Sequence, residues 1–544
     1  MPCLVAVLLA VGGLLGPGHS ASTGSDARSL SVIVQASDLA SAAHAVRSVG
    51  GTITHELGII DAVGARLTAA RLEALRRSRE VRRIYANRTV KAAARVGSAK
   101  QTDETFYPTL VGAARLHGEG IDGRGITVAV VDTGMYAGSV AHDWLRTNTN
   151  DVTRIMTKYD AVRNEIPTTA LLDRNGHGTH VTSVIASRKK NEKGKYQSIA
   201  PNVNLVIVKA FDVNGSGTYL NVIRGIDFIV RNRDVYKIRV LNLSFSAPPR
   251  SHYWDDPLNQ AVMRAWQAGI VVVVSAGNGG PNPMTVGVPG NVPYVITVGA
   301  MTDNYTPGVP GDDFLASFSA TGPTVEGFVK PELVAPGGHI VGLMEAKSLL
   351  ATTHDVFRGP GGYFKMSGTS QAAAVVSGIA ALVLQREPGL SPDEVKCRLM
   401  ATARPAVDPS GKRAYSVFQQ GAGLVDAYAA AHSGDNGCAN LAMDISLDLA
   451  GTTHYGGPAN RAEDGTYYLM GLEGDGYVWN GGYLWSDGYL WSSASLWSDA
   501  YLWSGGYLWS DSYLWSDAYL WSGGYLWSNG FTETMSVNKW VNQE

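Results

Sequence analysis

The chain of 544 residues is poor in charge, has only three cysteines and shows no excess of basic residues. Charged residues make up 17% and hydrophobic residues 45%, which excludes a mostly disordered protein. A formal net charge of −2 gives no reason to expect a nucleic-acid partner. No stretch beyond the N-terminus is apolar for long enough to cross a bilayer, so we expect a soluble or peripheral mature protein. The length predicts roughly two to four domains.

The N-terminus, MPCLVAVLLAVGGLLGPGHSAS, is apolar from Leu4 to Leu15 and then becomes small and polar. It resembles a secretory signal peptide over residues 1–22, although no Lys or Arg precedes the apolar run. We therefore expect an extracellular protein. Cys3 would leave with the signal, so that Cys397 and Cys438 remain as an even pair in an oxidising compartment. A disulfide between them would stabilise the fold by roughly 3–4 kcal/mol, and two unpaired buried cysteines are the alternative.

Charge is divided unevenly along the chain. Residues 1–100 contain 13 Lys and Arg against 6 Asp and Glu, and the rest contains 32 against 41. A basic N-terminal segment could dock onto an acidic body through complementary fields. A solvated basic helix face explains the same charge pattern equally well.

The pattern of apolar residues predicts two folded regions. Residues 30–90 read as βαββαβ, typical of a small ferredoxin-like α+β domain, and KAAARVGSAK then reads as an exposed linker. From about 105 to 433, nearly continuous β-branched runs alternate with helical stretches, which favours a doubly wound, mostly parallel α/β sheet. The expected buried strands are 126–132, 204–210, 238–244, 270–276 and 294–300.

Three short segments contain residues suited to nucleophilic catalysis. Asp132 ends a strand in VVDTG, His177 opens a helix in NGHGTHV, and Ser370 opens another in SGTSQAAA. Together they supply a nucleophile, a general base and a carboxylate that orients the base. Alone, each segment has an ordinary reading as a turn, a cap or a core residue. Their occurrence together, with Asp132 at the carboxyl end of a strand, favours a catalytic site.

The segments AVVDTG, NGHGTHV and MSGTSQAAAVVSG resemble the Asp, His and Ser signatures of the subtilisin-like serine peptidases, the subtilases. The resemblance covers roughly residues 105–433 and implies that Asp132, His177 and Ser370 form the catalytic triad. It also implies that Asn278, in SAGN, donates to the oxyanion, although it could be a plain turn residue. A triad of this kind needs no cofactor for its chemistry.

The same resemblance implies a division of the chain into a precursor and an enzyme. A signal peptide (1–22) and an inhibitory propeptide (23–100) would precede the peptidase domain (101–433). The propeptide would act as an intramolecular inhibitor and be cut off by the enzyme between about Val90 and Thr105. A linker or small extension (434–476), a hexapeptide repeat (477–530) and a tail (531–544) would follow.

The resemblance also implies how protein or peptide substrates bind. An extended substrate would pair with one strand of the enzyme by β-augmentation, and the residue before the cut bond would enter a pocket between two walls. None of these positions is acidic, which argues against a preference for basic residues and favours broad cleavage after apolar or aromatic residues. Ser246 stands where a glycine is common in the family, which would narrow the pocket. The pairing residues are Gly215, Ser216 and Gly217, and the walls are Ser244, Phe245 and Ser246 on one side and Ala276 and Gly277 on the other.

Two departures from the family pattern have consequences. Gln371 follows the nucleophile where methionine is frequent, so we expect tolerance of peroxide. The family's calcium loop follows the catalytic His helix, but here that stretch is SRKKNEKGKYQS. Calcium needs an oxygen-rich acidic loop, so we expect this site to be absent, and other structural calcium sites stay open.

The repeat YLWSDG and its variants fills residues 477–530. A period of six suits extended chain and not helix, and Asp-Gly, Gly-Gly and Asn-Gly pairs mark turns. The repeat could pack on itself or on the peptidase, bind cell wall or polysaccharide through its aromatic rings, or serve secretion or surface display. The sequence thus predicts a secreted serine endopeptidase, and binding through the repeat would hold it at the cell surface. The alternatives are an adhesion protein whose peptidase only processes it, and a catalytically inactive structural subtilase.

Overall fold

The computed structural model describes residues 29–92, 105–136, 140–168, 172–306, 308–309, 311–408, 411–462 and 465–469. The expected signal peptide, hexapeptide repeat and tail all lie outside these residues, as does most of the expected linker KAAARVGSAK. Within the described part of the chain, no helix is long and apolar enough to cross a membrane.

The N-terminal unit is a four-stranded antiparallel sheet covered by two helices, with its own core of valine, leucine and alanine side chains. The sheet order is β2-β3-β1-β4. Side chains start both helices: Asp38 accepts a hydrogen bond from Ser41 N, and Thr68 accepts one from Arg71 N. The elements are β1 (Leu30–Ala36), α1 (Leu39–Ser48), β2 (Thr52–Leu57), β3 (Ala62–Leu67), α2 (Ala69–Arg76) and β4 (Val81–Ala86).

The larger body is built on an eight-stranded sheet with the order β14-β13-β12-β10-β6-β8-β7, in which β15 also pairs with β13. Every described pair in it is parallel except β13 with β14, as expected of a doubly wound α/β fold. The strands are β6 (Thr127–Asp132), β7 (Ile155–Asp160), β8 (Asn204–Lys209), β10 (Ile238–Leu243), β12 (Val271–Ser275), β13 (Ile296–Thr302), β14 (Phe314–Leu315) and β15 (Leu333–Pro336).

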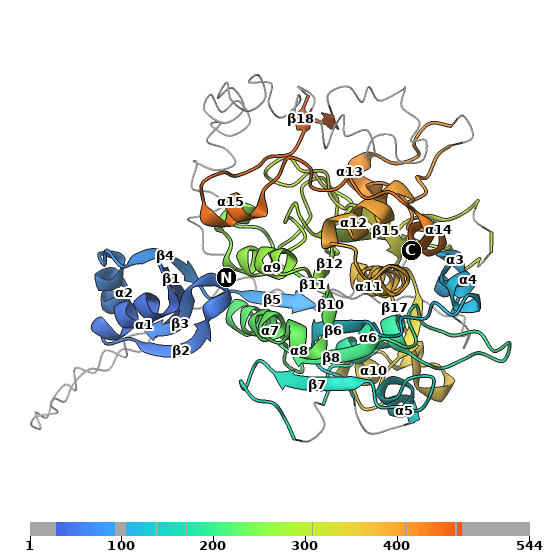
Figure 1. The fold of residues 1–544 in the computed structure, drawn as a ribbon, viewed down its shortest axis with the longest axis horizontal. Helices are drawn as coiled ribbons and strands as arrows, with labels where there is room; N and C mark the ends of the chain where they lie inside the picture. The colour runs from blue at the N-terminus through green and yellow to red at the C-terminus, as the bar shows by residue number, and fades with distance from the viewer. Residues whose placement is uncertain are drawn as a thin grey trace, which may run out of the picture.

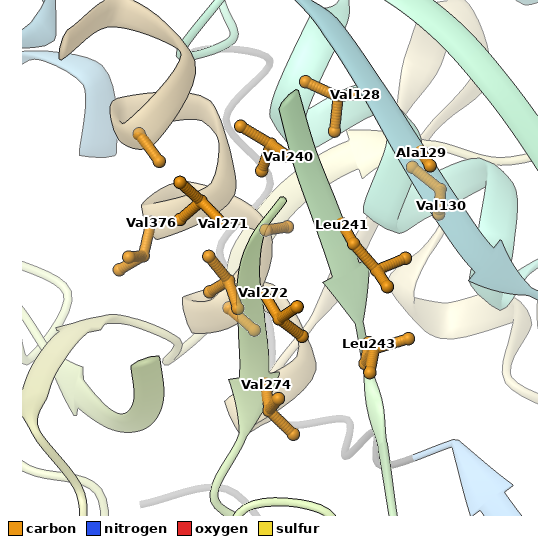
Figure 2. Packing of buried hydrophobic residues seen from close by; sticks show 14 of the residues in the cluster. Val128, Ala129, Val130, Val240, Leu241, Leu243, Val271, Val272, Val274 and Val376 are labelled. Carbon is orange, nitrogen blue, oxygen red and sulfur yellow. The ribbon is translucent and has the colours of Figure 1, made fainter. Parts of the chain in front are cut away.

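Helices cover the sheet on both faces, with α7 (Tyr219–Arg231) and α9 (Pro257–Gln267) on one and α6 (His177–Ala186) and α11 (Thr369–Arg386) on the other (Figure 1). The strands can be valine-rich throughout because both faces are buried. Figure 2 shows side chains from β6, β10 and β12 packed together, with Val376 of α11 beside them. The body also contains α3 (Tyr107–Leu110), α4 (Ala113–Gly118), α5 (Val140–Arg146), α8 (Arg233–Tyr236), α10 (Leu349–Thr353), α12 (Pro392–Ala401), α13 (Val417–Gln420), α14 (Ala427–His432), β16 (Ile340–Leu343) and β17 (Tyr363–Met366).

The N-terminal unit lies against α7 and α9 of the body (Figure 1). Polar contacts join the two parts in addition to apolar packing. Arg224 donates to Thr54 O (3.0 Å), Asp227 accepts from Ile59 N (3.1 Å), and Gln35 donates to Gln260 Oε1 (2.9 Å).

The segment that follows the unit enters the body as a strand. The sequence predicts one strand over VRRIYANRTV, but the structure divides it into β4 and β5 (Thr89–Ala92). The break lies at Asn87 and Arg88, whose oxygen atoms accept hydrogen bonds from the backbone at the start of α7. Beyond it, β5 runs antiparallel between β9 (Ser216–Thr218) and β11 (Phe245–Ser246) and forms a separate three-stranded sheet.

The stretch after residue 433 is packed on the body as far as Leu469. Cys397 of α12 and Cys438 form a disulfide, and the short helix α15 (Ile445–Ala450) lies against α9. Asp448 of α15 is buried and accepts hydrogen bonds from Tyr253 Oη (2.6 Å) and Tyr294 Oη (3.0 Å). A hairpin of β18 (Ala459–Arg461) and β19 (Tyr467–Leu469) completes it, so this stretch is an ordered extension where it is described.

Candidate active site

Asp132 and His177 meet at the carboxyl end of the central sheet. Asp132 is the last residue of β6, and its side chain is 2% exposed. His177 Nδ1 lies 2.8 Å from Asp132 Oδ1 and 2.9 Å from Oδ2. Thr133 N also donates to Asp132 Oδ1 at 2.7 Å, which holds the carboxylate in place. A carboxylate at Nδ1 selects the tautomer that carries its proton there and leaves Nε2 able to accept one.

His177 is the first residue of α6 and is fully buried. The preceding residue, Gly176, has φ of 106°, a backbone conformation that favours glycine and turns the chain sharply into the helix. Among the residues that the structure describes, His177 Nε2 has no hydrogen-bond partner. A buried ring nitrogen without a partner, whose other nitrogen is bonded to a carboxylate, suits a general base.

The loop before His177 is held by a second buried carboxylate, that of Asp173, which is 1% exposed. Asp173 Oδ1 accepts hydrogen bonds from Thr133 Oγ1 (2.8 Å), Asn175 N (3.1 Å) and Gly176 N (2.8 Å). Its Oδ2 accepts from Thr179 N (2.8 Å) and Thr179 Oγ1 (2.7 Å). Asp173 therefore ties the residue after Asp132 to the first turn of the helix that begins with His177.

Ser370 is the second residue of α11, and it is fully buried. Its Oγ donates to Ser244 O at 3.0 Å, and Ser244 Oγ donates in return to Ser370 O at 3.0 Å. The helices α6 and α11 pack against each other, and Gln371, which follows Ser370, lies 3.4 Å from His180, which is three residues after His177. The first turn of α11 brings backbone N–H groups and the positive end of a helix dipole to the nucleophile.

Asn278 lies beside this turn and is oriented by Thr369. Its Oδ1 accepts hydrogen bonds from Thr369 N (3.0 Å) and Thr369 Oγ1 (2.9 Å). The same Oγ1 accepts from Gly277 N at 3.2 Å. Because the amide oxygen is engaged by Thr369, the Nδ2 end is the part of the side chain that can donate to a substrate oxygen.

The expected substrate-binding residues lie on the two strands that flank β5 and on a neighbouring loop. Gly215 leads into β9, which contains Ser216 and Gly217, and Lys91 of β5 pairs with Ser216. On the other side Lys91 pairs with Ser246 of β11, and Ala92 pairs with Phe245. Ser244 connects β10 to β11, and Ala276 and Gly277 follow β12. The structure thus brings all eight residues to the surroundings of β5 and Ser370.

Gln371, next to the nucleophile, is buried against His180 of α6. Gln371 Nε2 lies 3.4 Å from His180 Nδ1, and His180 Nε2 lies 3.1 Å from Phe364 O. Burial lowers the pKa of His180 to about 3, so this imidazole stays neutral. It places no positive charge beside the candidate triad.

A buried arginine lies at the end of α6, where the loop SRKKNEKGKYQS begins. The carbonyl oxygens of Ala186 and Pro201 accept hydrogen bonds from the guanidinium of Arg154, which is fully buried and also donates to Thr147 O. Lys189 of the loop lies over the ring of Tyr363, 3.9 Å from its centroid. Two protein cations, Arg154 and Lys189, therefore lie at this end of the helix. In the described residues no cluster of three or more His, Cys, Asp or Glu is arranged to hold a metal ion.

Sequence reasoning missed two residues that build this site, Asp173 and Thr369. Asp173 precedes His177 by four residues, and Thr369 immediately precedes Ser370. Thr369 stands inside SGTSQAAA, whereas Asp173 stands two residues before NGHGTHV. The bonds that join Thr133 to Asp173 and Thr369 to Asn278 link residues that are distant in the sequence, and no local pattern marks those.

The chain is similar in sequence to subtilisin-like serine proteases. The sequence profile of the Subtilase family matches residues 123–423, which include Asp132, His177 and Ser370. The serine protease AprX of Bacillus subtilis (strain 168) is 40% identical over 325 residues, which are 58% of this chain and 68% of that protein. Subtilisin DY of Bacillus licheniformis is 32% identical over 324 residues, 59% of this chain and 96% of that protein.

A solved structure is similar in fold. It is that of fervidolysin from Fervidobacterium pennivorans, described as a keratinolytic enzyme related to subtilisin. The superposition has a TM-score of 0.57 at 23% identity and covers 74% of this chain and 61% of that one. This likeness supports the fold alone.

Proposed function

The chain belongs to the subtilase family and is a subtilisin-like serine endopeptidase, and we propose that Asp132, His177 and Ser370 are its catalytic triad. The observation that carries this assignment is the buried Asp132–His177 pair, with Nε2 of His177 unpartnered within the described residues. Proteins and peptides are the substrates of such an enzyme.

In the proposed reaction Ser370 Oγ attacks the carbonyl carbon of the peptide bond while His177 Nε2 takes its proton. Asp132 keeps the proton on Nδ1 and stabilises the imidazolium that forms. His177 then gives its proton to the leaving amine, which leaves an acyl-enzyme on Ser370, and water removes the acyl group by the same steps in reverse roles. The bond from Ser370 Oγ to Ser244 O must be exchanged for one to His177 as the substrate binds, which is usual for hydroxyl rotors.

Asn278 would stabilise the negative charge that develops on the carbonyl oxygen. The bonds from Thr369 fix its amide, so that the Nδ2 donor is in position before the charge forms. Such preorganised donors usually contribute about 10²–10³ in rate. The backbone N–H groups of the first turn of α11 would add to the same hole.

The N-terminal unit would serve as an inhibitory propeptide. Its support is β5, which follows the unit and pairs on both sides with strands that would bind an extended substrate. The register runs from Thr89 toward Ala92 and approaches Ser244, whose carbonyl is bonded to Ser370. We place the first self-cleavage on the carboxyl side of Ala92, before Thr105.

One experiment tests the function. The full chain and its Ser370→Ala variant are expressed, and processing is followed by mass spectrometry while casein cleavage is followed in solution. The wild type should lose its N-terminal unit and cut casein, and Ser370→Ala should do neither. An unprocessed wild type that leaves casein intact would contradict the triad and the propeptide together. If the Ser370→Ala variant lost its N-terminal unit when incubated without wild-type enzyme, that result would contradict the triad.

Secretion and a surface role for the hexapeptide repeat are further parts of the proposal. They rest on the apolar start of the chain and on the aromatic composition of residues 477–530. Deleting 477–530 should leave casein cleavage unchanged and remove binding to cell wall or insoluble polysaccharide. Equal binding by both forms would contradict the targeting role, and loss of casein cleavage would show that the repeat supports the fold.

A further inference from the structure

We infer that the hydroxymethyl group of Ser246 restricts the primary specificity pocket, so that the enzyme cuts after small side chains, alanine above all, and not after aromatic ones. The inference rests on the proposed function, since it concerns the substrate of the same site. It differs from the broad apolar or aromatic preference that the sequence suggested.

The side chain of Ser246 occupies the space between two glycines that carry no side chain of their own. A Cβ atom added to Gly287 would lie 1.9 Å from Ser246 Oγ, and one added to Gly277 would lie 3.0 Å from it. Gly277 belongs to one expected wall of the pocket and Ser246 to the other. The hydroxyl therefore stands where the two walls face each other, in space that glycine at position 246 would leave open.

Backbone hydrogen bonds prevent the walls from moving apart. Ala247 N donates to Val288 O (3.0 Å) and Val288 N donates to Ala247 O (2.7 Å). Gly287 N donates to Ala276 O (3.1 Å), so the segment with Gly287 is joined to both walls. Behind them Ala276 packs with Val286 and Ala320 in a small buried cluster. These bonds fix the spacing of the walls, so that the side chain at position 246 decides how much of the space between them is filled.

The chain's own sequence supports a small residue before the cut. In β5, Lys91 pairs with Ser246, and the strand runs on through Ala92 toward Ser244 and the nucleophile. The sequence continues with Ala93 and Ala94 before Arg95. The proposed range for the first cut, after Ala92 and before Thr105, therefore begins with three positions that would place alanine in the primary pocket.

The test uses the self-processed enzyme and two tetrapeptide p-nitroanilides that differ only in the last residue, alanine or phenylalanine. The wild type should cleave the alanine substrate with the higher kcat/KM. Ser246→Gly should raise the phenylalanine-to-alanine ratio of kcat/KM by about tenfold or more, the usual effect of opening an apolar pocket by one or two heavy atoms. Ser246→Ala, which keeps Cβ and loses Oγ, should give an intermediate ratio.

Ser251→Gly is the matched control, since it makes the same substitution outside the pocket on the same segment and should keep the wild-type ratio. A wild type that prefers the phenylalanine substrate would overturn the inference, and so would a kcat/KM ratio that is unchanged in both Ser246 variants. If casein is still cleaved in either case, the peptidase assignment stands. Absence of casein cleavage would instead count against the proposed triad. Sequencing the new N-terminus adds a second readout: a residue other than alanine before the cut would overturn the inference.

Discussion

Replacing Asp173 by asparagine should destabilise the protein and slow it, although Asp173 is not part of the triad. Its carboxylate is 1% exposed and accepts five hydrogen bonds, three at Oδ1 and two at Oδ2. Asparagine has nearly the same shape, but one oxygen becomes an NH₂ group that can only donate. Whichever way the amide turns, at least one backbone N–H loses its acceptor and faces another donor, because a threonine hydroxyl can rotate to accept instead.

The magnitude follows from these bonds. A hydrogen bond to a charged group is worth about 1.5–3 kcal/mol, so the loss of one such bond should lower the free energy of unfolding by about 1.5–3 kcal/mol. Thr133 follows Asp132, and Gly176 precedes His177, so a shift of this loop would move both groups. A displacement of this kind commonly costs about 10²-fold in rate. We expect kcat to fall by about that factor, with KM changed much less.

Unfolding should be measured by guanidinium titration in a Ser370→Ala background, where self-digestion cannot contribute. The rate should be measured with the native serine. Asp234→Asn is the control, because the Asp234 side chain is 83% exposed and should give changes within about 0.5 kcal/mol. If Asp173→Asn matched that control in stability and kept kcat within twofold, the positioning role assigned to Asp173 would be refuted.

Asn278→Ala should lower kcat by about 10²–10³ with little change in KM, and a loss confined to KM in steady-state kinetics would contradict the oxyanion role. Burial lowers the pKa of His55 in the N-terminal unit to about 4, below its ordinary value of 6.5. A proton therefore binds His55 more tightly in the released unit than in the docked one, so protonation favours release. The affinity of the unit for the processed body, measured by inhibition, should be full above pH 6.5 and fall as pH drops toward 4, and His55→Gln should lose most of that pH dependence if the reasoning holds. With Gln371 after the nucleophile the enzyme should resist peroxide, whereas Gln371→Met should be inactivated in the same residual-activity assay; rapid loss in the wild type traced to this site would exclude the explanation. Replacing Cys397 and Cys438 together by serine should cost about 3–4 kcal/mol in guanidinium unfolding, and an unchanged midpoint would show that the disulfide does not contribute.

Much of the fold could be predicted because its signals are local. The valine-rich runs that became β6, β10 and β12 indicate strands buried on both faces, and their alternation with helices indicates a doubly wound sheet. The order of elements in the N-terminal unit could be read in the same way. The prediction of a single strand over VRRIYANRTV was wrong in its extent. Asn87 and Arg88 accept hydrogen bonds from the backbone at the start of α7, and the chain beyond them forms a new strand in another sheet.

The chemistry of the site could be predicted from residue types alone. Asp132, His177 and Ser370 stand in three motifs whose residue types supply a carboxylate, a base and a nucleophile, and those motifs remain recognisable without coordinates. How the groups are held depends on the assembled fold. The bonds from Thr133 to Asp173 and from Thr369 to Asn278 join residues that the chain brings near only when the sheet and its helices assemble. The same holds for Ser246, whose effect depends on two glycines 31 and 41 positions further along the chain. Motifs depend on local residue types, whereas the size of a pocket depends on which distant segments share its walls.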